Sequence, residues 1–239
     1  MAAAVREVNL KAWAAPPDEG RLRGLESNTK KATAFVRKVR ALTEESRASL
    51  IDDMSKLNLR LYVSEVAAAI AEAKLRGGDM GAATAVASAM HQLYAEFSKE
   101  LLPLVHKAAV APTSPNEPEA DRAARLGRKR TALRLLGELF AAGVSNDFAS
   151  LLSALKEMAR QDAECSKAAE SGPSTFLLAN LTGIVGFSKH CAPALLGPHL
   201  PALAAAAAAD GGGADANGGG TKPSASAPVS YTHLRAHET

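Results

Sequence analysis

The chain is 239 residues long, carries a formal net charge of +3, and is 47% hydrophobic but only 4% aromatic. That length accommodates one good-sized domain with flexible ends, and a composition this poor in aromatic residues favours closely packed helices over a β-sandwich. The two cysteines, Cys165 and Cys191, exclude a disulfide framework and favour a reducing, cytosolic or nuclear environment. The N-terminal sequence lacks the apolar core of a secretory signal, and prolines interrupt the uncharged stretch 192–209, so no membrane span is expected.

Residues 1–20 are expected to form an extension that ends in the turn-rich sequence PPDEG. A basic amphipathic helix follows over residues 28–42, where Ser27 or Asn28 can accept a hydrogen bond from the first turn. On a 3.6-residue wheel its apolar residues share one side and its cations share the other. The apolar side consists of Ala32, Phe35, Val36, Val39 and Leu42, and the cationic side consists of Lys30, Lys31, Arg37, Lys38 and Arg40.

Four more helices are expected before position 110. Thr43 is the expected cap of the first, and Gly77 with Gly78 supplies the left-handed residue that often ends the second. The third begins after Asp79 and extends to Phe97, and the fourth has a proline near its start, where the missing N–H does little harm. Their apolar stripes are Leu50, Ile51, Met54 and Leu57, then Tyr62, Val63, Val66 and Ile70, then Ala83, Val86, Met90, Leu93, Tyr94 and Phe97, and finally Leu101, Leu102 and Val105.

A loop over residues 111–120 separates these helices from a long one over about 119–142, which is expected to end at Gly143. Further apolar segments follow over 148–158 and 175–196. Because no convincing alternating strand is present, the predicted fold class is all-α. Helix pairs that recur at roughly 35 to 45 residues predict a HEAT-like α-solenoid of antiparallel helix pairs, and a compact bundle is the alternative.

The C-terminal composition changes to alanine, glycine and serine, which predicts a disordered tail. Residues 229–239 resemble a translated sequencing-adapter read-through, and no function is assigned to them. The expected organisation is therefore an N-terminal extension over 1–20, a helical domain over 21–200 and a tail over 201–239.

No catalytic, cofactor or small-molecule site is predicted. His233, His237 and Glu238 have a spacing that helical metal ligands use, but they lie in the adapter-like residues, so no metal site is predicted. His190 and Cys191 are sequence neighbours that point in different directions from a helix. They are therefore interpreted as a pair at the edge of the core, and not as a base and a nucleophile.

Two concentrations of basic residues remain, one between positions 21 and 42 and one between positions 122 and 134. Phosphate groups or an acidic partner would pair with such residues through salt-sensitive contacts, whereas the alternative is an ordinary solvated helix face. Aromatic residues that would stack on bases are not interleaved, so sequence-specific RNA reading is not expected. The candidate RNA-binding or partner-binding residues are Lys30, Lys31, Arg37, Lys38, Arg40, Arg128, Lys129 and Arg130.

Three segments carry a resemblance to a known family: SNTKKATAFVRK at 27–38, LNLRLYVSEVAAAIAEAKL at 57–75 and HQLYAEF at 91–97. Weaker similarities follow in LRLLGELFAAGV at 133–144 and GFSKHCAPALLG at 186–197. Over about residues 20–200, the chain resembles the first middle domain, of the initiation factor 4G type, in the second up-frameshift factors of nonsense-mediated mRNA decay. This family is also called regulator of nonsense transcripts two.

The resemblance implies a HEAT-like, all-helical domain in a non-enzymatic adaptor of the cytoplasm and the perinuclear region. In this family the adaptor joins the RNA helicase of the decay pathway to a partner bound at exon junctions. Those contacts are assigned to two further middle domains and a C-terminal helicase-binding region, which this chain is expected to lack. No partner-binding residue is therefore carried over from the family.

The leading hypothesis is a scaffold domain of the nonsense-mediated decay machinery that acts through protein contacts, with RNA contacts as an open addition. The alternative is another middle-domain protein that binds RNA, or a translation or splicing helicase, directly through its basic helix. A helical enzyme with a pocket between helices is the third hypothesis.

Overall fold

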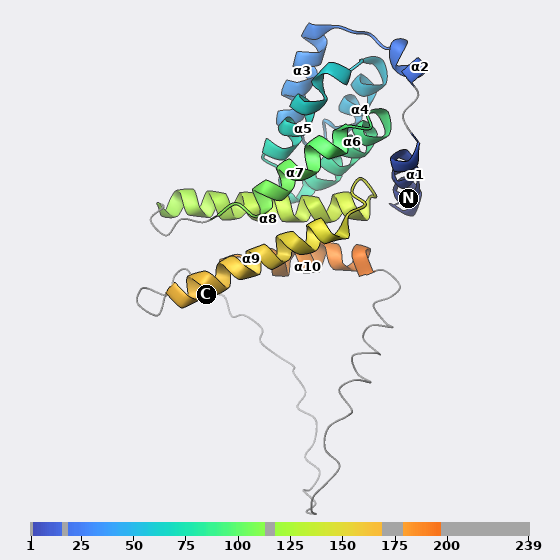
Figure 1. Cartoon of the computed structure of the whole chain (residues 1–239). Coiled ribbons are helices and arrows are strands. Elements are labelled where there is room, and N and C mark those ends of the chain that lie inside the picture. The colour runs from blue at the N-terminus through green and yellow to red at the C-terminus, as the bar shows by residue number, and fades with distance from the viewer. Residues whose placement is uncertain (1, 16–18, 113–117, 169–178, 197–239) are drawn as a thin grey trace, which may run out of the picture. The chain divides into compact units, whose positions relative to one another are not determined.

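The computed structural model describes residues 2–15, 19–112, 118–168 and 179–196, and within these ranges it contains helices and no strands. The α-helices are α1 (Ala2–Ala14), α2 (Glu19–Arg23), α3 (Thr29–Arg40), α4 (Arg47–Lys56), α5 (Val63–Glu72), α6 (Met80–Leu93), α7 (Phe97–Ala109), α8 (Glu119–Ala141), α9 (Phe148–Ala168) and α10 (Leu181–Leu196) (Figure 1). Two 3₁₀ turns, η1 (Arg60–Tyr62) and η2 (Gly77–Asp79), precede α5 and α6. The predicted all-α class is confirmed, whereas the predicted disordered tail lies outside the described residues. Among the described helices, none has both the length and the hydrophobicity that crossing a membrane requires.

Alternate helices stack on one another (Figure 1). α3 packs against α5, α5 against α7 and α7 against α9, whereas α4 packs against α6, α6 against α8 and α8 against α10. Because α3, α5 and α7 begin at Thr29, Val63 and Phe97, successive helix pairs start 34 residues apart. Stacked helix pairs in which each pair contacts its neighbours are the arrangement of α-solenoids, the class that includes HEAT proteins. The structure therefore confirms the predicted solenoid in place of a compact bundle.

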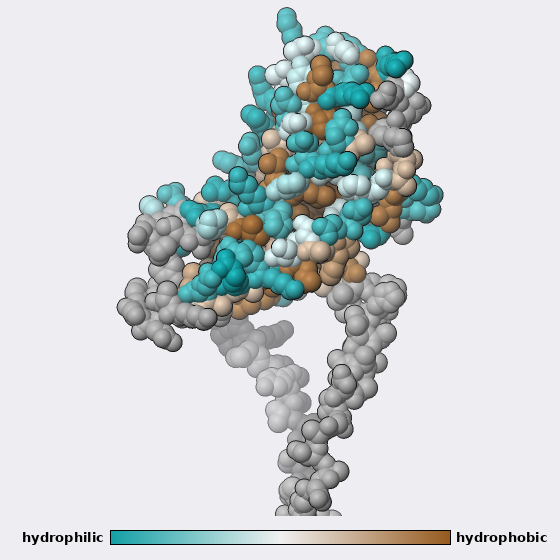
Figure 2. All heavy atoms as spheres, viewed as in Figure 1, coloured by the Kyte–Doolittle hydropathy of each residue, from teal (hydrophilic) through white to brown (hydrophobic). Residues whose placement is uncertain are grey.

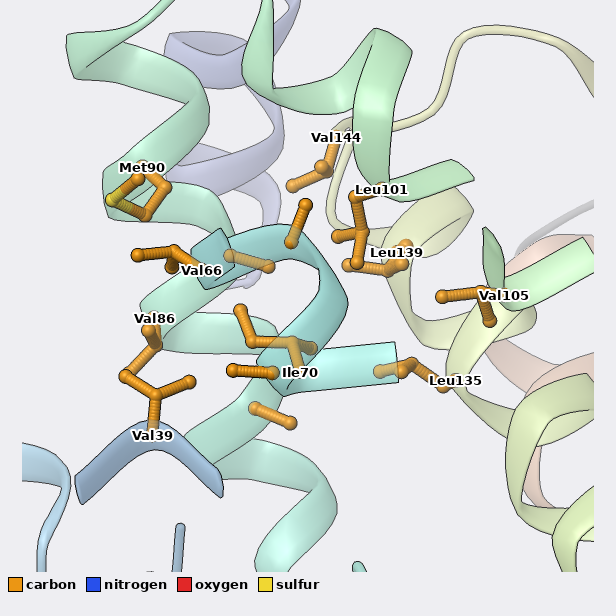
Figure 3. Close-up of a cluster of buried hydrophobic side chains, with 14 of the residues drawn as sticks. Val39, Val66, Ile70, Val86, Met90, Leu101, Val105, Leu135, Leu139 and Val144 are labelled. Atoms are coloured by element: carbon orange, nitrogen blue, oxygen red, sulfur yellow. The ribbon is translucent and has the colours of Figure 1, made fainter. Parts of the chain in front are cut away.

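The core lies between these two stacks. Many of its larger side chains come from α3, α5, α6, α7, α8 and the turn after α8, and they include Val39, Val66, Ile70, Val86, Met90, Leu101, Val105, Leu135, Leu139 and Val144 (Figure 3). Alanines at positions 67, 69, 82, 83 and 87 are fully buried where α5 and α6 contribute to the core. Since an alanine side chain is short, neighbouring backbones can approach closely at these positions. The surface view shows mainly polar side chains with small, separate apolar groups (Figure 2).

One expected helix end is confirmed and another is wrong. α8 ends before Gly143, whose φ of +80° makes it the one glycine with positive φ in the described residues. Val144 and Ser145 then donate their backbone N–H groups to the Leu139 carbonyl, which satisfies a helix-end acceptor. Gly77 and Gly78 do not play this role, because α5 already ends at Glu72 and the two glycines form η2 with Asp79.

Three smaller expectations also fail. Thr43 does not cap a helix directly, since α4 begins only at Arg47 and Thr43 forms a turn with Ser46. Ile51 is 37% exposed and lies outside the core. Pro103 is inside α7 and not near its start. Its side chain is exposed, so the proline ring meets solvent at this point of the helix.

Side chains of α1 cap the end of α8. Arg6 donates to the carbonyls of Phe140 and Ala141, Asn9 donates to the Ala142 carbonyl at 2.8 Å, and Trp13 donates to the Gly143 carbonyl at 3.2 Å. Carbonyls in the last turn of a helix lack intrahelical donors, and a cation there is also favoured by the helix dipole. The first helix of the chain thus completes the end of a helix more than 130 residues away.

α1 is attached to α6 through a buried polar group. The Asn9 side chain exchanges hydrogen bonds with Ser88 and accepts one from Gln92 at 2.7 Å. The His91 ring contacts the Asn9 carbonyl through Nε2 at 3.0 Å and the Ser98 hydroxyl through Nδ1 at 2.7 Å. The Trp13 ring lies 4.9 Å from the His91 ring. A neutral imidazole that donates from Nε2 and accepts at Nδ1 satisfies both contacts.

The stability of the chain is expected to fall as the pH drops below 6.5. Burial lowers the pKa of His91 below its ordinary value of 6.5, so the unfolded chain binds this proton more readily than the folded chain does. The stabilising contribution of neutral His91 is therefore present above pH 6.5 and is lost on acidification. Urea unfolding between about pH 5 and 7.5 measures this dependence, in a window above the ordinary titration of the carboxylates.

The matched variant for this measurement is His91→Gln, which retains polar atoms but no ionisable group. Its free energy of unfolding should depend less on pH between about 5 and 7.5 than that of the unchanged chain. Equal slopes for the two proteins would show that His91 does not cause the dependence.

Candidate partner-binding surfaces

α3 presents its basic residues to solvent because its opposite face is anchored in the core. The helix begins at Thr29, where the Asn28 side chain accepts a hydrogen bond from the Lys31 N–H at 3.1 Å, as the sequence predicts. Ala32, Phe35, Val36 and Val39 are buried. The five cations of the helix are exposed, namely Lys30, Lys31, Arg37, Lys38 and Arg40.

The five cations of α3 divide into two sets. Lys31 lies 2.6 Å from Glu26 and lowers the pKa of that carboxyl through a hydrogen bond, and Lys38 lies 2.7 Å from Asp53. The other three, Lys30, Arg37 and Arg40, form no ion pair within the described residues. At about 100° per residue, these three share an arc of about 80° on the helix. They are the α3 cations that remain open to an external anion.

The second basic concentration is not a single surface. Arg128 and Arg130 are exposed on α8, but Lys129 between them is only 1% exposed. The predicted role of Lys129 in surface binding is therefore corrected: its amine points inward and donates to Gln161 Oε1 at 2.6 Å. Burial lowers the pKa of Lys129, and the nearby carboxylates of Asp162 and Glu157 oppose that shift.

Asp162 organises the start of α10, a role that the sequence reasoning missed. Its buried carboxylate accepts the backbone N–H groups of Asn180 and Leu181 at 3.0 to 3.1 Å and the Asn180 side-chain amide at 2.9 Å. The same amide reaches the Met158 carbonyl at 3.2 Å. An acidic residue is favourable at a helix N-terminus, so α9 holds the first turn of α10 electrostatically. The hydrogen bond between Asp162 and Asn180 joins residues 18 positions apart, so no local sequence pattern predicts it.

The other sites considered in the sequence do not converge. His190 is exposed and Cys191 is buried, which agrees with an edge-of-core pair, and burial raises the pKa of the Cys191 thiol to about 11. His233, His237 and Glu238 lie outside the described residues. Among the residues that the structure describes, no group of three or more His, Cys, Asp or Glu side chains could hold a metal ion.

No protein-family model matches the chain, but individual proteins do. The chain is 38% identical over 142 residues to Regulator of nonsense transcripts UPF2 of Arabidopsis thaliana and 31% identical over 196 residues to Regulator of nonsense transcripts 2 of Homo sapiens. These matches cover 59% and 81% of this chain but only 12% and 14% of the two relatives. The chain is also 31% identical over 126 residues to Nonsense-mediated mRNA decay protein 2 of Saccharomyces cerevisiae, which covers 50% of this chain and 12% of that protein.

Solved structures of UPF2 domains also match the chain. The first MIF4G domain of human nonsense-mediated decay factor UPF2 matches with a TM-score of 0.59 and 29% identity, over 80% of this chain and 57% of that one. The chain carries a MIF4G domain of the UPF2 family. The N-terminal domain of Saccharomyces cerevisiae Upf2 matches this MIF4G domain with a TM-score of 0.52 and 27% identity, over 62% of this chain and 49% of that one. The recognised resemblance is thereby confirmed, while the binding roles of the candidate residues in the MIF4G domain stay predictions.

Proposed function

We propose that this MIF4G domain is a non-enzymatic scaffold in a nonsense-mediated mRNA decay factor and acts through protein contacts. The observation that carries the proposal is the similarity to UPF2, which extends over 81% of the chain in sequence and 80% in structure. The names of the relatives describe regulators of nonsense transcripts. The transfer of that role to this chain is the proposal.

The geometry of the domain supports a scaffold. Its buried ionisable side chains are used for internal contacts, because His91 and Lys129 join helices and Asp162 holds the start of α10. Stacked helix pairs present long surfaces on which partners bind. The proposed partners are other decay factors, including the helicase and the exon-junction partner expected from the resemblance, and the proposed location is the cytoplasm and the perinuclear region.

A deletion in the native gene tests the proposal. Removal of the codons for residues 20–200 should slow the decay of a reporter transcript with a premature stop codon. The decay rate of a matched transcript without that stop codon should not change. Affinity purification of the tagged protein with and without these residues measures decay-complex assembly in parallel. Unchanged assembly together with unchanged reporter decay would contradict the proposal.

A second candidate function is contact with RNA phosphates through α3. The observation that favours it is the common arc of Lys30, Arg37 and Arg40, all exposed and without an ion-pair partner within the described residues. Phosphate contacts of this kind are ionic and carry little sequence specificity. This candidate adds to the scaffold role and does not compete with it.

The triple substitution of Lys30, Arg37 and Arg40 by glutamine is expected to weaken RNA binding and to flatten its salt dependence. Each lost phosphate contact reduces the slope of log affinity against log salt by about 0.7 for a single strand. Filter binding with a uridine homopolymer between about 50 and 200 mM salt measures the slope. The control substitutes Lys31 and Lys38, whose charges are already paired. An unchanged slope in the triple variant would remove the second candidate.

A further inference from the structure

A pocket of about 480 Å³ opens where the end of α5 meets α7 and the first half of α8. Behind its lining lie the buried side chains of Ile70, Val105 and Leu135, which belong to the hydrophobic cluster in Figure 3. Its walls include alanines at positions 71, 73, 108, 124 and 132. Because these side chains end at Cβ, the packing of three helices leaves room there for an apolar side chain supplied from outside.

The lining contains three charged side chains, two positive and one negative, and all three are exposed. Lys74 and Arg128 are cations, and Glu72 is the acid. Neither Lys74 nor Arg128 makes a hydrogen bond or an ion pair within the described residues. The charged side chains of the lining sum to one net positive charge.

The chemistry of the lining selects the class of ligand. Nucleic-acid bases stack mainly on aromatic side chains, and the fourteen lining residues include none. Small polar ligands need several converging hydrogen-bonding groups, and Thr131 is the one uncharged polar side chain in the lining. An apolar lining with a net positive charge at its rim fits a protein segment, because an apolar anchor can enter while acidic neighbours remain at the rim.

We propose that this pocket binds an extended or helical protein segment in which one or two leucine-sized side chains are flanked by aspartate or glutamate. The inference rests on the proposed scaffold function and names a contact site for it. The apolar anchor packs on the partly or fully exposed alanines of the lining, at positions 71, 73, 108 and 124. The flanking carboxylates pair with Arg128 and Lys74, which steers the segment and fixes its direction on the surface.

The test uses the 239-residue chain and a phage-displayed library of random peptides of about 12 residues. Selection should enrich sequences with a leucine, isoleucine, methionine or phenylalanine next to Asp or Glu. Fluorescence polarisation then measures the affinity of three enriched peptides, synthesised with a label. Ala124→Trp places a large ring in the pocket and should weaken binding at least tenfold, or about 1.4 kcal/mol. Arg128→Glu should weaken binding about three- to tenfold at low salt.

Matched variants distinguish an effect at the pocket from an effect of the same substitution elsewhere on the surface. Ala123→Trp adds the same ring at the neighbouring exposed position of α8, and Arg37→Glu reverses an exposed cation of α3; both should leave the affinity within about twofold. Circular dichroism and the thermal midpoint establish that each variant is folded. If Ala124→Trp unfolds the chain, the test rests on the peptide affinities of Arg128→Glu and Arg37→Glu, and equal affinities would contradict the inference.

Three results would overturn the inference. These are the absence of any enriched sequence class, equal affinity of the enriched peptides for the Ala124→Trp and Ala123→Trp variants, and binding of a uridine homopolymer that is lost in Arg128→Glu and in Ala124→Trp. None of these results tests the scaffold role, which the reporter measurement tests separately. Slow decay of the reporter after deletion, combined with failed peptide binding, would refute the pocket and retain the proposed function.

Discussion

Replacing Asp162 with alanine is expected to lower the free energy of unfolding by about 3–5 kcal/mol. The substitution removes the acceptor of the Asn180 and Leu181 N–H groups and leaves the buried Lys129 amine without its foremost attractive carboxylate. A buried charge that loses its partner costs more than the pair contributed, since its desolvation is no longer compensated. Urea unfolding followed by circular dichroism at neutral pH measures the difference.

Two control substitutions define the cause. Glu164→Ala removes an exposed carboxylate from the same helix, α9, and should cost less than about 1 kcal/mol. Lys129→Met removes the buried cation but keeps every N–H partner of Asp162, so it should be milder than Asp162→Ala. A cost for Asp162→Ala that matches that of Glu164→Ala would show that the carboxylate does not hold α10.

Replacing Gly137 with valine is expected to destabilise the chain by about 3 kcal/mol. A Cβ atom at this position would lie 2.5 Å from the ring of Phe187 and 2.7 Å from the Cys191 sulfur. Both neighbours are buried on α10, so relief of the clash requires α10 to move away from α8. Thermal unfolding should show a lower midpoint and, because the packing of α8 on α10 is disturbed, faster thiol labelling of Cys191.

Gly127→Val is the matched control on the same helix, since a Cβ atom at Gly127 would meet no atom within 4 Å. Its stability should stay within about 0.5 kcal/mol of the unchanged chain. If the Gly127 and Gly137 variants were equally stable, the close approach of α8 and α10 would not determine stability.

The sequence predicted α3 well because the determinants of α3 are local. Asn28 is a short polar side chain at the first turn, and Phe35 and Val39 repeat with the helical period. The same reasoning failed for Lys129, because α8 is packed by several helices and its polar positions do not all face solvent. Gln161, which accepts the hydrogen bond of Lys129, is 32 residues further along the chain. Burial of this lysine therefore depends on tertiary packing that a helical wheel of α8 alone does not contain.

Some residues in the segments that carry the family resemblance make buried contacts inside the domain. The buried Tyr94 hydroxyl accepts a hydrogen bond from the Leu59 N–H at 2.8 Å, which joins the segment at 57–75 to the one at 91–97. His91 in the second segment binds the α1 backbone. These residues therefore make internal contacts of the domain. Exposed positions such as Arg37 and Arg128 are the ones where the sequence leaves the binding role open.

The capping of α8 by α1 has a consequence for the chain during its synthesis on the ribosome. Asn9 and Arg6 bind carbonyls of residues 140–142, so their acceptors do not exist until more than 130 further residues have been added. At about 5–20 residues per second, the wait lasts roughly 7–27 s. The contacts of α1 with the end of α8 therefore form later than its contacts with Ser88, His91 and Gln92 of α6. Until the end of α8 has been made, the Arg6 guanidinium and the Trp13 N–H lack these carbonyl acceptors.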